Sequence, residues 1–530
     1  MFLPLAQAQF GRGGGTWNTA GADAQRSSWA RTDNRINSTS MPGFAFLWKV
    51  KLANDAKQQY ALSPAVMVDS YIGYRGFRSY AFVGGASNNV IALDTDLGRM
   101  EWTKNFGAVS GQSTAACPGA MTAGVTRTAT LAFPAAGAAG GRGGRGGGRG
   151  AQSGVGEPEA GAVTIGQGRA GGGFGGFPGA PGGSGRGGRG PGAPGGRGAG
   201  PGRGARPPEA VYAVTTDGML HTLYISNGED AKPPVRFLPA NANAAGIIMI
   251  DNVIYATTSG NCGGVPNGVW AIDTAEASPA PIHWSTNGGG VAGNFGAAFG
   301  PSESVYVATG DGDYSPAAYS DSVVSLETKT LKLKDWFTPG KSEFTASPVV
   351  FEMNEGEKAH ELIAAANKDG RIYLLNSESL GGADHKTPLA SASLGSAAHS
   401  LASWQDPSGT RWILAGTDGN ITALKVTMQG GKPSIQTGWT SRAITSPIGP
   451  VVINGFVFAA STGSGSTLYG FDGVTGKEVF NSGSTIQGSL THSGEISGSA
   501  GQLYLSTADS TLYAFGIPLV PPDLAAKTKN

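Results

Sequence analysis

The chain has 530 residues, of which 39% are hydrophobic and 14% are charged, and its formal net charge is +1. This length supports one large domain with a continuous buried core. The near-neutral balance excludes a globally basic nucleic-acid-binding protein and an acidic solvating chain. No apolar run is long enough for a transmembrane helix. We therefore expect a globular monomer with no nucleic-acid partner and no transmembrane segment.

The chain begins MFLPLAQAQFGRGGG. Residues 1–15 resemble the end of a secretory signal, because a short apolar stretch is followed by Q-A-Q, which is similar to an A-x-A cleavage site. A charged start is missing, so a disordered tail is the alternative. We predict an exported protein, periplasmic or extracellular, in which the two cysteines Cys117 and Cys262 can form one disulfide.

A repeat runs through most of the chain. A short apolar strand and a small turn precede A-L-D and then G-x-x-x-W, as in VIALDTDLGRMEW (Val90–Trp102) and LYGFDGVTGKEVF (Leu468–Phe480). Eight copies are anchored on Leu93, Leu223, Ile272, Leu326, Leu375, Leu424, Phe471 and Phe515. Each copy shows four short stretches with period-2 alternation and no helical pattern. Repeats of this length with four strands predict an all-β fold, an eight-bladed β-propeller of four-stranded antiparallel blades.

The two ends of the chain are expected to complete one blade together. The last copy, TLYAFGIP, stops before a fourth strand, and the segment Phe44–Ala53 is an otherwise unpaired strand that carries Trp48. Pairing this segment with the last copy would remove the exposed edge of an open ring. We expect the tail 519–530 to lie outside the propeller.

A low-complexity segment, residues 137–208, interrupts the second repeat. It holds nine arginines and two glutamates among glycine, alanine and proline, so it is strongly basic while the remaining chain is acidic. Such a composition cannot form a packed core, and we expect a disordered insert between propeller regions 16–136 and 209–518. The flanking sequences TRTATLAF and VYAVTTDG are interpreted as the first two strands of the second blade. The RGG-like steps are able to contact RNA or an anionic surface, and a solvated linker or spacer is the favoured interpretation.

The A-L-D-x-x-x-G-x-x-x-W repeat resembles the pyrroloquinoline-quinone (PQQ) repeat of quinoprotein alcohol dehydrogenases and of related non-catalytic propellers. The opening TWNTAGADAQRSSW is also similar to the start of those domains. The resemblance covers nearly all of the chain outside the insert. It implies the propeller fold and does not by itself imply a function.

Most of the cofactor residues that the resemblance would imply are replaced. Where the enzymes carry adjacent cysteines, Cys117 is followed by proline. Cys262, in SGNCGG, takes the place of a calcium-binding glutamate, and sulfur is a poor ligand for that hard cation. Asn294 falls where the family has a stacking tryptophan, and Asp311 falls where it has a calcium-binding asparagine.

Two further positions bear on the enzyme resemblance. The offset of the family's catalytic aspartate leads to a proline, Pro316, in a loop of altered length, and Asp313 or Asp321 are alternatives. Lys368, in NKDGRIYLLN, matches the quinone-contacting lysine, although K-D-G is equally an ordinary hairpin turn.

In a four-stranded blade, the turns between second and third strands lie on the same face as the connections between blades. This rule places six residues on one face around a central funnel: Cys117, Cys262, Asp311, Lys368, His399 and His492. The two cysteines are expected to form a disulfide with a Cα–Cα separation of roughly 4.4–6.8 Å. A thiol pair that binds metal or exchanges electrons is the alternative. The basic insert is expected to leave from the opposite face.

Two functions follow from these residues. The favoured hypothesis is a non-catalytic binding or assembly protein without a cofactor, which holds a protein or small-molecule ligand at its funnel or rim. The alternative is a PQQ-dependent dehydrogenase with calcium and a rearranged site, based on Lys368 and Asp311. The catalytic residues of such an enzyme are unknown from the sequence.

Overall fold

The computed structural model describes residues 17–54, 62–73, 76–107, 117, 125–126, 128–129, 210–355, 358–430, 432–492 and 495–518. Contacts divide the chain into two units, Met1–Ala139 with Pro208–Asn530, and Gly140–Pro207. The predicted insert 137–208, the signal-like start and the tail 519–530 lie outside the described residues. The helices in the described part are the short turns η1 (Met41–Gly43), η2 (Cys262–Gly264) and η3 (Gly382–Asp384), and none of them could cross a membrane.

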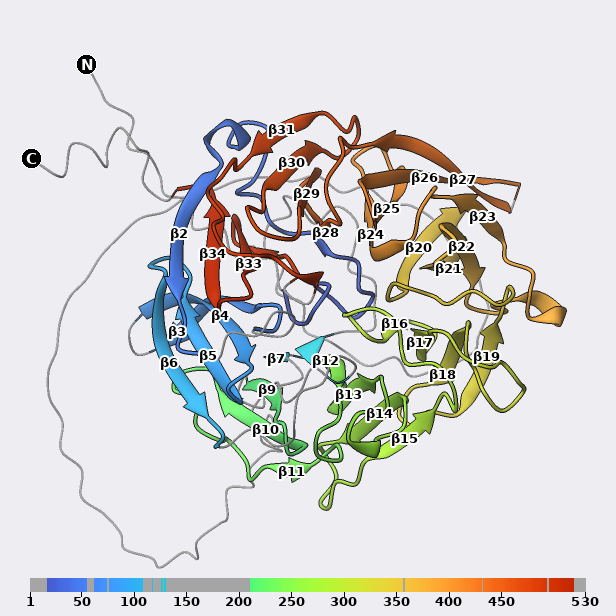
Figure 1. Cartoon of the computed structure of the whole chain (residues 1–530), viewed down its shortest axis with the longest axis horizontal. Coiled ribbons are helices and arrows are strands. Elements are labelled where there is room, and N and C mark those ends of the chain that lie inside the picture. Colours follow the sequence, from blue (N-terminus) through green and yellow to red (C-terminus); the bar gives the residue numbers. More distant parts are fainter. Residues whose placement is uncertain are drawn as a thin grey trace, which may run out of the picture. The chain divides into compact units, whose positions relative to one another are not determined.

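Eight antiparallel sheets form the blades of a propeller (Figure 1). The strands of each blade are called A to D from the axis outwards. Blades one to four are β3 (Val66–Gly73), β4 (Gly76–Gly85), β5 (Asn89–Asp94), β6 (Arg99–Asn105); β7 (Val125–Thr126), β9 (Ala210–Val214), β10 (Met219–Tyr224), β11 (Val235–Arg236); β12 (Ala244–Ile250), β13 (Val253–Thr258), β14 (Gly268–Asp273), β15 (Ile282–Ser285); and β16 (Ala298–Gly300), β17 (Ser304–Ala308), β18 (Val323–Glu327), β19 (Leu333–Phe337).

Blades five to eight follow in the same order. They are β20 (Val349–Glu355), β21 (Lys358–Ala366), β22 (Arg371–Asn376), β23 (Ala390–Ser393); β24 (Ala398–Gln405), β25 (Arg411–Thr417), β26 (Ile421–Gln429), β27 (Lys432–Thr440); β28 (Ile448–Ile453), β29 (Phe456–Ala460), β30 (Leu468–Asp472), β31 (Glu478–Asn481); and β32 (Ser497–Ser499), β33 (Gln502–Ser506), β34 (Thr511–Gly516), β2 (Ala45–Lys51). The predicted eight-bladed propeller is confirmed.

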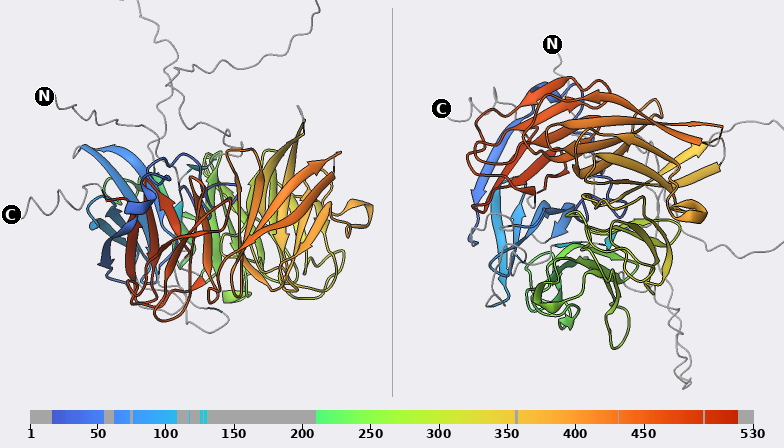
Figure 2. Two further views of the ribbon diagram at one scale, coloured as in Figure 1. Left: turned by 90° about the horizontal axis from the view of Figure 1, so that it is seen from above. Right: turned by 45° about the vertical axis from the view of Figure 1, so that its right-hand side comes forward.

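The burial of the strands explains their sequence pattern. Middle strands such as β13, β17 and β29 are buried at every residue, because neighbouring blades cover both of their faces. Outer strands such as β6 and β2 are exposed or half-buried along their length. Figure 2 shows the strands from the side, running between two faces of the ring. The apolar core therefore lies between blades, not within any single sheet.

A strand from the N-terminal part of the chain completes the eighth blade. Strand β2 pairs antiparallel with β34 from Ala45 opposite Gly516 to Lys51 opposite Thr511. The N-terminal strand is therefore the outer strand of the last blade, as the unpaired Phe44–Ala53 segment predicted. This pairing closes the ring by hydrogen bonds between the two ends of the sequence.

The second blade departs from the sequence prediction. TRTATLAF does not form one strand there, because β7 pairs with β9 whereas β8 (Thr128–Ala129) pairs parallel with β12 of the third blade. The segment thus joins two blades, and residues 130–133 lie outside the described part. Ala129 lies opposite Ile250, at the A–B turn of the third blade, and Ala210 begins strand B of the second. Both described neighbours of the insert therefore lie at the face opposite the B–C turns.

Contacts between blades account for the G-x-x-x-W element of the repeat. Trp102 at the outer strand of the first blade donates its indole N–H to the carbonyl of Ile225 in the second, at 2.9 Å. Its ring lies against Gly228, where a Cβ atom would come within 2.5 Å of the indole and where φ is +72°. Only glycine fits this left-handed turn beneath a ring. The same arrangement joins Trp48 to Thr95 and Gly98, and Trp439 to Gly473 and Gly476.

The segment Trp17–Ile36 fills the axis and contacts all eight blades in chain order. Its hydrogen bonds to blades one to eight pair Trp17 with Met67, Asn18 with Thr126, Thr19 with Ile247, Ala24 with Phe299, Gln25 with Val350, Ser27 with Ser403, Ser28 with Val452, and Asp33 with Gly501. Within it, β1 (Trp29–Ala30) adds a parallel inner strand beside β28. We call this segment the axial segment. It acts as a shared inner partner for all eight blades, including blades that are not neighbours in the ring.

Arg26 anchors the axial segment. Its side chain is completely buried, and its guanidinium donates to the carbonyls of Ala297 at 2.7 Å and Gly246 at 2.8 Å, in the fourth and third blades. It also donates to Ala20 and Thr19 of the axial segment itself. Burial lowers the pKa of Arg26 to about 9, which nearby Asp23 partly offsets. At neutral pH the group is still a cation that ties two blades to the axial segment.

Candidate functional site

The connections on one face of the ring carry most of the chemistry-bearing side chains that the sequence singled out. We call this face, which holds the B–C turns and the connections from strand D to the next strand A, the B–C face. Cys262, Asp311 and Lys368 lie in the B–C turns of blades three, four and five. His399 is the second residue of strand β24, and His492 lies in the connection before β32. These positions form three separate groups of contacts, described below, not one cluster.

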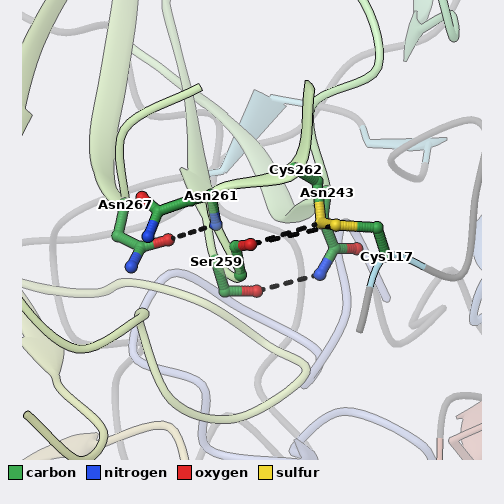
Figure 3. Close-up of a disulfide and its surroundings, with 7 residues drawn as sticks. Cys117, Asn243, Ser259, Asn261, Cys262 and Asn267 are labelled. Carbon is green, nitrogen blue, oxygen red and sulfur yellow. Dashed lines mark hydrogen bonds between the residues drawn. A yellow bond between two sulfur atoms is a disulfide. The ribbon is translucent and has the colours of Figure 1, made fainter. Parts of the chain in front are cut away.

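The first group is the disulfide between Cys117 and Cys262, with a Cα–Cα separation of 5.5 Å (Figure 3). This pairing confirms the predicted bridge and excludes a free thiol pair in this state. The turn that carries Cys262 is held by the backbone N–H of Asn261, which donates to the side chain of Asn267 at 2.9 Å. The bridge therefore fastens the segment before the second blade to a well-braced turn of the third.

The second group contains the two histidines. Their ring centroids are 5.0 Å apart. His399 Nε2 lies 2.6 Å from a carboxylate oxygen of Asp418, and His492 Nε2 lies 2.8 Å from the hydroxyl of Ser446. Burial, and then the neighbouring His399, lower the pKa of His492 to about 4, while Asp418 opposes the shift. His492 is therefore neutral at physiological pH.

A hydrogen bond crosses the axis beside these histidines. Asn294, from the fourth blade, donates its side-chain amide to the carbonyl of His492 at 2.7 Å and to Glu495 Oε1 at 3.3 Å. The connections of blades four and eight, which are opposite in an eight-membered ring, thus meet over the axis. Glu495 is only 4% exposed, and burial raises its pKa to about 7 despite the hydrogen bonds from Asn294 and from the backbone of Gly449.

The third group lies on the fourth and fifth blades. Lys368 Nζ is 2.7 Å from Glu343 Oε1, and the backbone N–H of Asp311 donates to Glu343 Oε2 at 3.4 Å. The ammonium of Lys368 remains largely exposed, and the hydrogen bond to Glu343 raises its pKa. Asp321 lies at the end of the same B–C turn as Asp311, is 1% exposed and has a left-handed φ of +52°. Burial, and then the charges of Asp311 and Glu343, raise the pKa of Asp321 to about 6.

The residues present do not fit a quinone with calcium. The sulfur of Cys262 is bonded to Cys117. The side-chain amide of Asn294 is hydrogen-bonded across the axis to the carbonyl of His492. Within the described ranges, no group of three histidine, cysteine, aspartate or glutamate side chains could hold a metal ion. The assignment of Asn294, Asp311 and Lys368 to a cofactor stays a prediction, and their observed partners are protein groups.

Several residues of this face were not found from the sequence. Asp418, Ser446 and Glu343 each sit in a short connection and contact a residue that the sequence did single out. Glu495 carried one usable signal, because it is a lone carboxylate among small residues three positions after His492. Arg26, in the axial segment, carried no such signal, since arginine is rarely buried completely.

Comparison with known proteins supports the fold. No protein-family model and no curated protein matches the sequence. The structure is similar to quinohemoprotein alcohol dehydrogenase from Comamonas testosteroni, with a TM-score of 0.55, 13% identity, and coverage of 96% of this chain and 81% of that one. It is also similar to the quinohemoprotein alcohol dehydrogenase ADHIIG of Pseudomonas putida HK5, with a TM-score of 0.55, 12% identity, and coverage of 96% of this chain and 81% of that one. A europium-containing methanol dehydrogenase has a TM-score of 0.54 and 10% identity, with coverage of 94% of this chain and 89% of that one. At such identities the likeness establishes a shared eight-bladed propeller fold and leaves the function to be argued from the site.

Proposed function

We propose that this protein is an exported propeller that binds a partner on its B–C face and performs no redox chemistry of its own. The observation that carries the proposal is the bond from Asn294 to the carbonyl of His492. It joins opposite blades at the place where the resemblance puts a stacking side chain beneath a quinone. Because the polar groups at the centre of this face are hydrogen-bonded to each other, a partner is expected to contact side chains farther out. Examples are Lys368, His399 and Asp418.

The disulfide supports export. A bridge such as Cys117–Cys262 persists in an oxidising compartment and is kept reduced in the cytosol of most organisms. Rapid thiol trapping in intact cells tests this point. Both cysteines should be unavailable to a maleimide until a reductant is added, and labelling without a reductant would contradict export.

Spectroscopy tests the absence of quinone chemistry. The purified protein is incubated with PQQ and calcium, dialysed, and assayed for a quinone absorbance band and for dye reduction with alcohols and sugars. We expect no retained band and no turnover. A stoichiometric band together with substrate-dependent dye reduction would overturn the proposal.

One observation favours the second candidate, a quinoprotein-type dehydrogenase with a rearranged site. Asp321 is a buried carboxyl with a raised pKa on the same face as Lys368, which are properties of a general base. If the incubated protein turns over alcohols, Asp321→Asn should abolish turnover while PQQ remains bound. Turnover that survives this substitution would remove Asp321 as the base.

A further inference from the structure

The third group of the B–C face contains an unsatisfied acceptor. Asp321 Oδ1 is buried and accepts no hydrogen bond within the part of the chain that the structure describes. Leaving such an acceptor without a donor costs free energy that folding does not recover. The left-handed backbone at this aspartate adds strain. Both costs are of the kind that binding sites retain, because a ligand can supply the missing donor.

The neighbouring charges indicate which donor is missing. The charges of Asp311 and Glu343 both disfavour the ionised form of Asp321. We call these three residues the carboxylate cluster. Lys368 already lies on Glu343, and Lys341 is the other cation that acts on Asp321. The cluster therefore keeps an excess of negative charge beside an acceptor without a donor.

The surrounding surface has the same sign. In the described connections of the B–C face, blades four to six carry six acidic and three basic residues: Asp311, Asp313, Asp321, Glu343, Asp369 and Asp418, against Lys341, Lys368 and Arg442. Described connections of blades one to three on this face carry one charged residue, Asp217. Those of blades seven and eight carry two, Glu495 and Asp509, so acidic residues are most numerous on blades four to six. Such a field attracts a cation and orients it towards that sector.

We propose that the carboxylate cluster binds a guanidinium or ammonium group of the ligand, with Asp321 accepting one of its N–H donors. This inference rests on the proposed function, because it names the chemistry of the partner held on the B–C face. Arginine is well suited to this cluster, since its planar guanidinium can donate hydrogen bonds to Asp321 and Asp311 at the same time, while Lys368 remains paired with Glu343. The cation could belong to a polypeptide or to a small amine.

Calorimetry with matched probes tests the charge. L-Argininamide and L-citrullinamide have nearly the same shape and differ in the guanidinium, and each is titrated into the full-length, disulfide-intact protein at pH 8. We expect argininamide to bind at least tenfold more tightly. Equal affinities would overturn the proposal. Acetyl-Gly-Arg-Gly-amide is the third probe: tighter binding than argininamide indicates a polypeptide ligand, and weaker binding indicates a small amine.

Substitutions locate the site. Asp321→Asn should lower the affinity for argininamide at least tenfold, whereas the matched control Asp251→Asn, an exposed left-handed turn residue on the opposite face, should leave it unchanged. Glu343→Gln is the second variant if Asp321→Asn does not fold, and it should also weaken binding. Unchanged affinity in the folded variant would overturn the assignment. These titrations contain no quinone. Equal binding of the probes would therefore overturn the cation site and leave the proposed function standing. Quinone-dependent turnover would overturn the proposed function and leave the cation site standing.

Discussion

Glu495 offers a test of the electrostatics at the axis. Its raised pKa means that the folded protein holds a proton on this carboxyl more tightly than the unfolded chain does. Ionising this carboxyl therefore costs the folded state almost no stability below pH 4.5. The full loss of stability is reached once the pH rises above 7. A shift from 4.5 to about 7 corresponds to about 3 kcal/mol of lost stability at pH 8 and only a few tenths of a kcal/mol at pH 4.

Glu495→Gln removes this penalty and keeps an oxygen for the amide of Asn294. The free energy of unfolding of the variant minus that of the unmodified protein should increase by about 3 kcal/mol from pH 4 to pH 8. Urea unfolding at pH 4, 6 and 8, followed by tryptophan fluorescence, measures the difference. Glu276→Gln, at an exposed glutamate of the third blade, is the matched control and should show no such rise. A difference that stays flat across these pH values would refute a buried, raised carboxyl.

Three further predictions concern stability. Cys117→Ala, which opens a bridge between residues 145 apart in the sequence, should lower the unfolding free energy by up to about 5 kcal/mol, and reduction of the unmodified protein should cause the same loss; a smaller loss on reduction would contradict the bridge. Gly228→Ala should cost about 2 kcal/mol in denaturant unfolding, and in a double-mutant cycle with Trp102→Phe the two costs should not add, so strict additivity would exclude the interblade contact. Arg26→Met should cost about 3 kcal/mol or more, because carbonyls of two blades lose their donor, and an unchanged melting temperature would rule out an anchoring role.

The fold was predictable because each blade is written locally. Period-2 strands, a hairpin turn and the spacing from Gly98 to Trp102 recur in every well-preserved copy, and each signal lies within one repeat. The disulfide was predictable for a related reason. Once the blades are counted, topology alone places Cys117 and Cys262 on one face of neighbouring blades.

The interior of the site was not predictable in this way. Asn294 and His492 lie 198 residues apart, and no local pattern records that their connections meet over the axis. The segment TRTATLAF misled for the opposite reason: its β-propensity is continuous, whereas the chain changes blades between Thr126 and Thr128. Contacts between opposite blades depend on the radius of the ring, which the sequence of a single repeat does not determine.

The axial segment also has a consequence for how the protein is made. Asp33 of the axial segment accepts a hydrogen bond from the backbone N–H of Gly501, which lies 468 residues later in the sequence. The segment cannot complete its contacts until the eighth blade is present, and β2 must likewise wait for β34. Such long-range pairing slows folding. Any state in which the last blade is missing therefore leaves β2 unpaired and leaves the axial segment without its contact to the eighth blade.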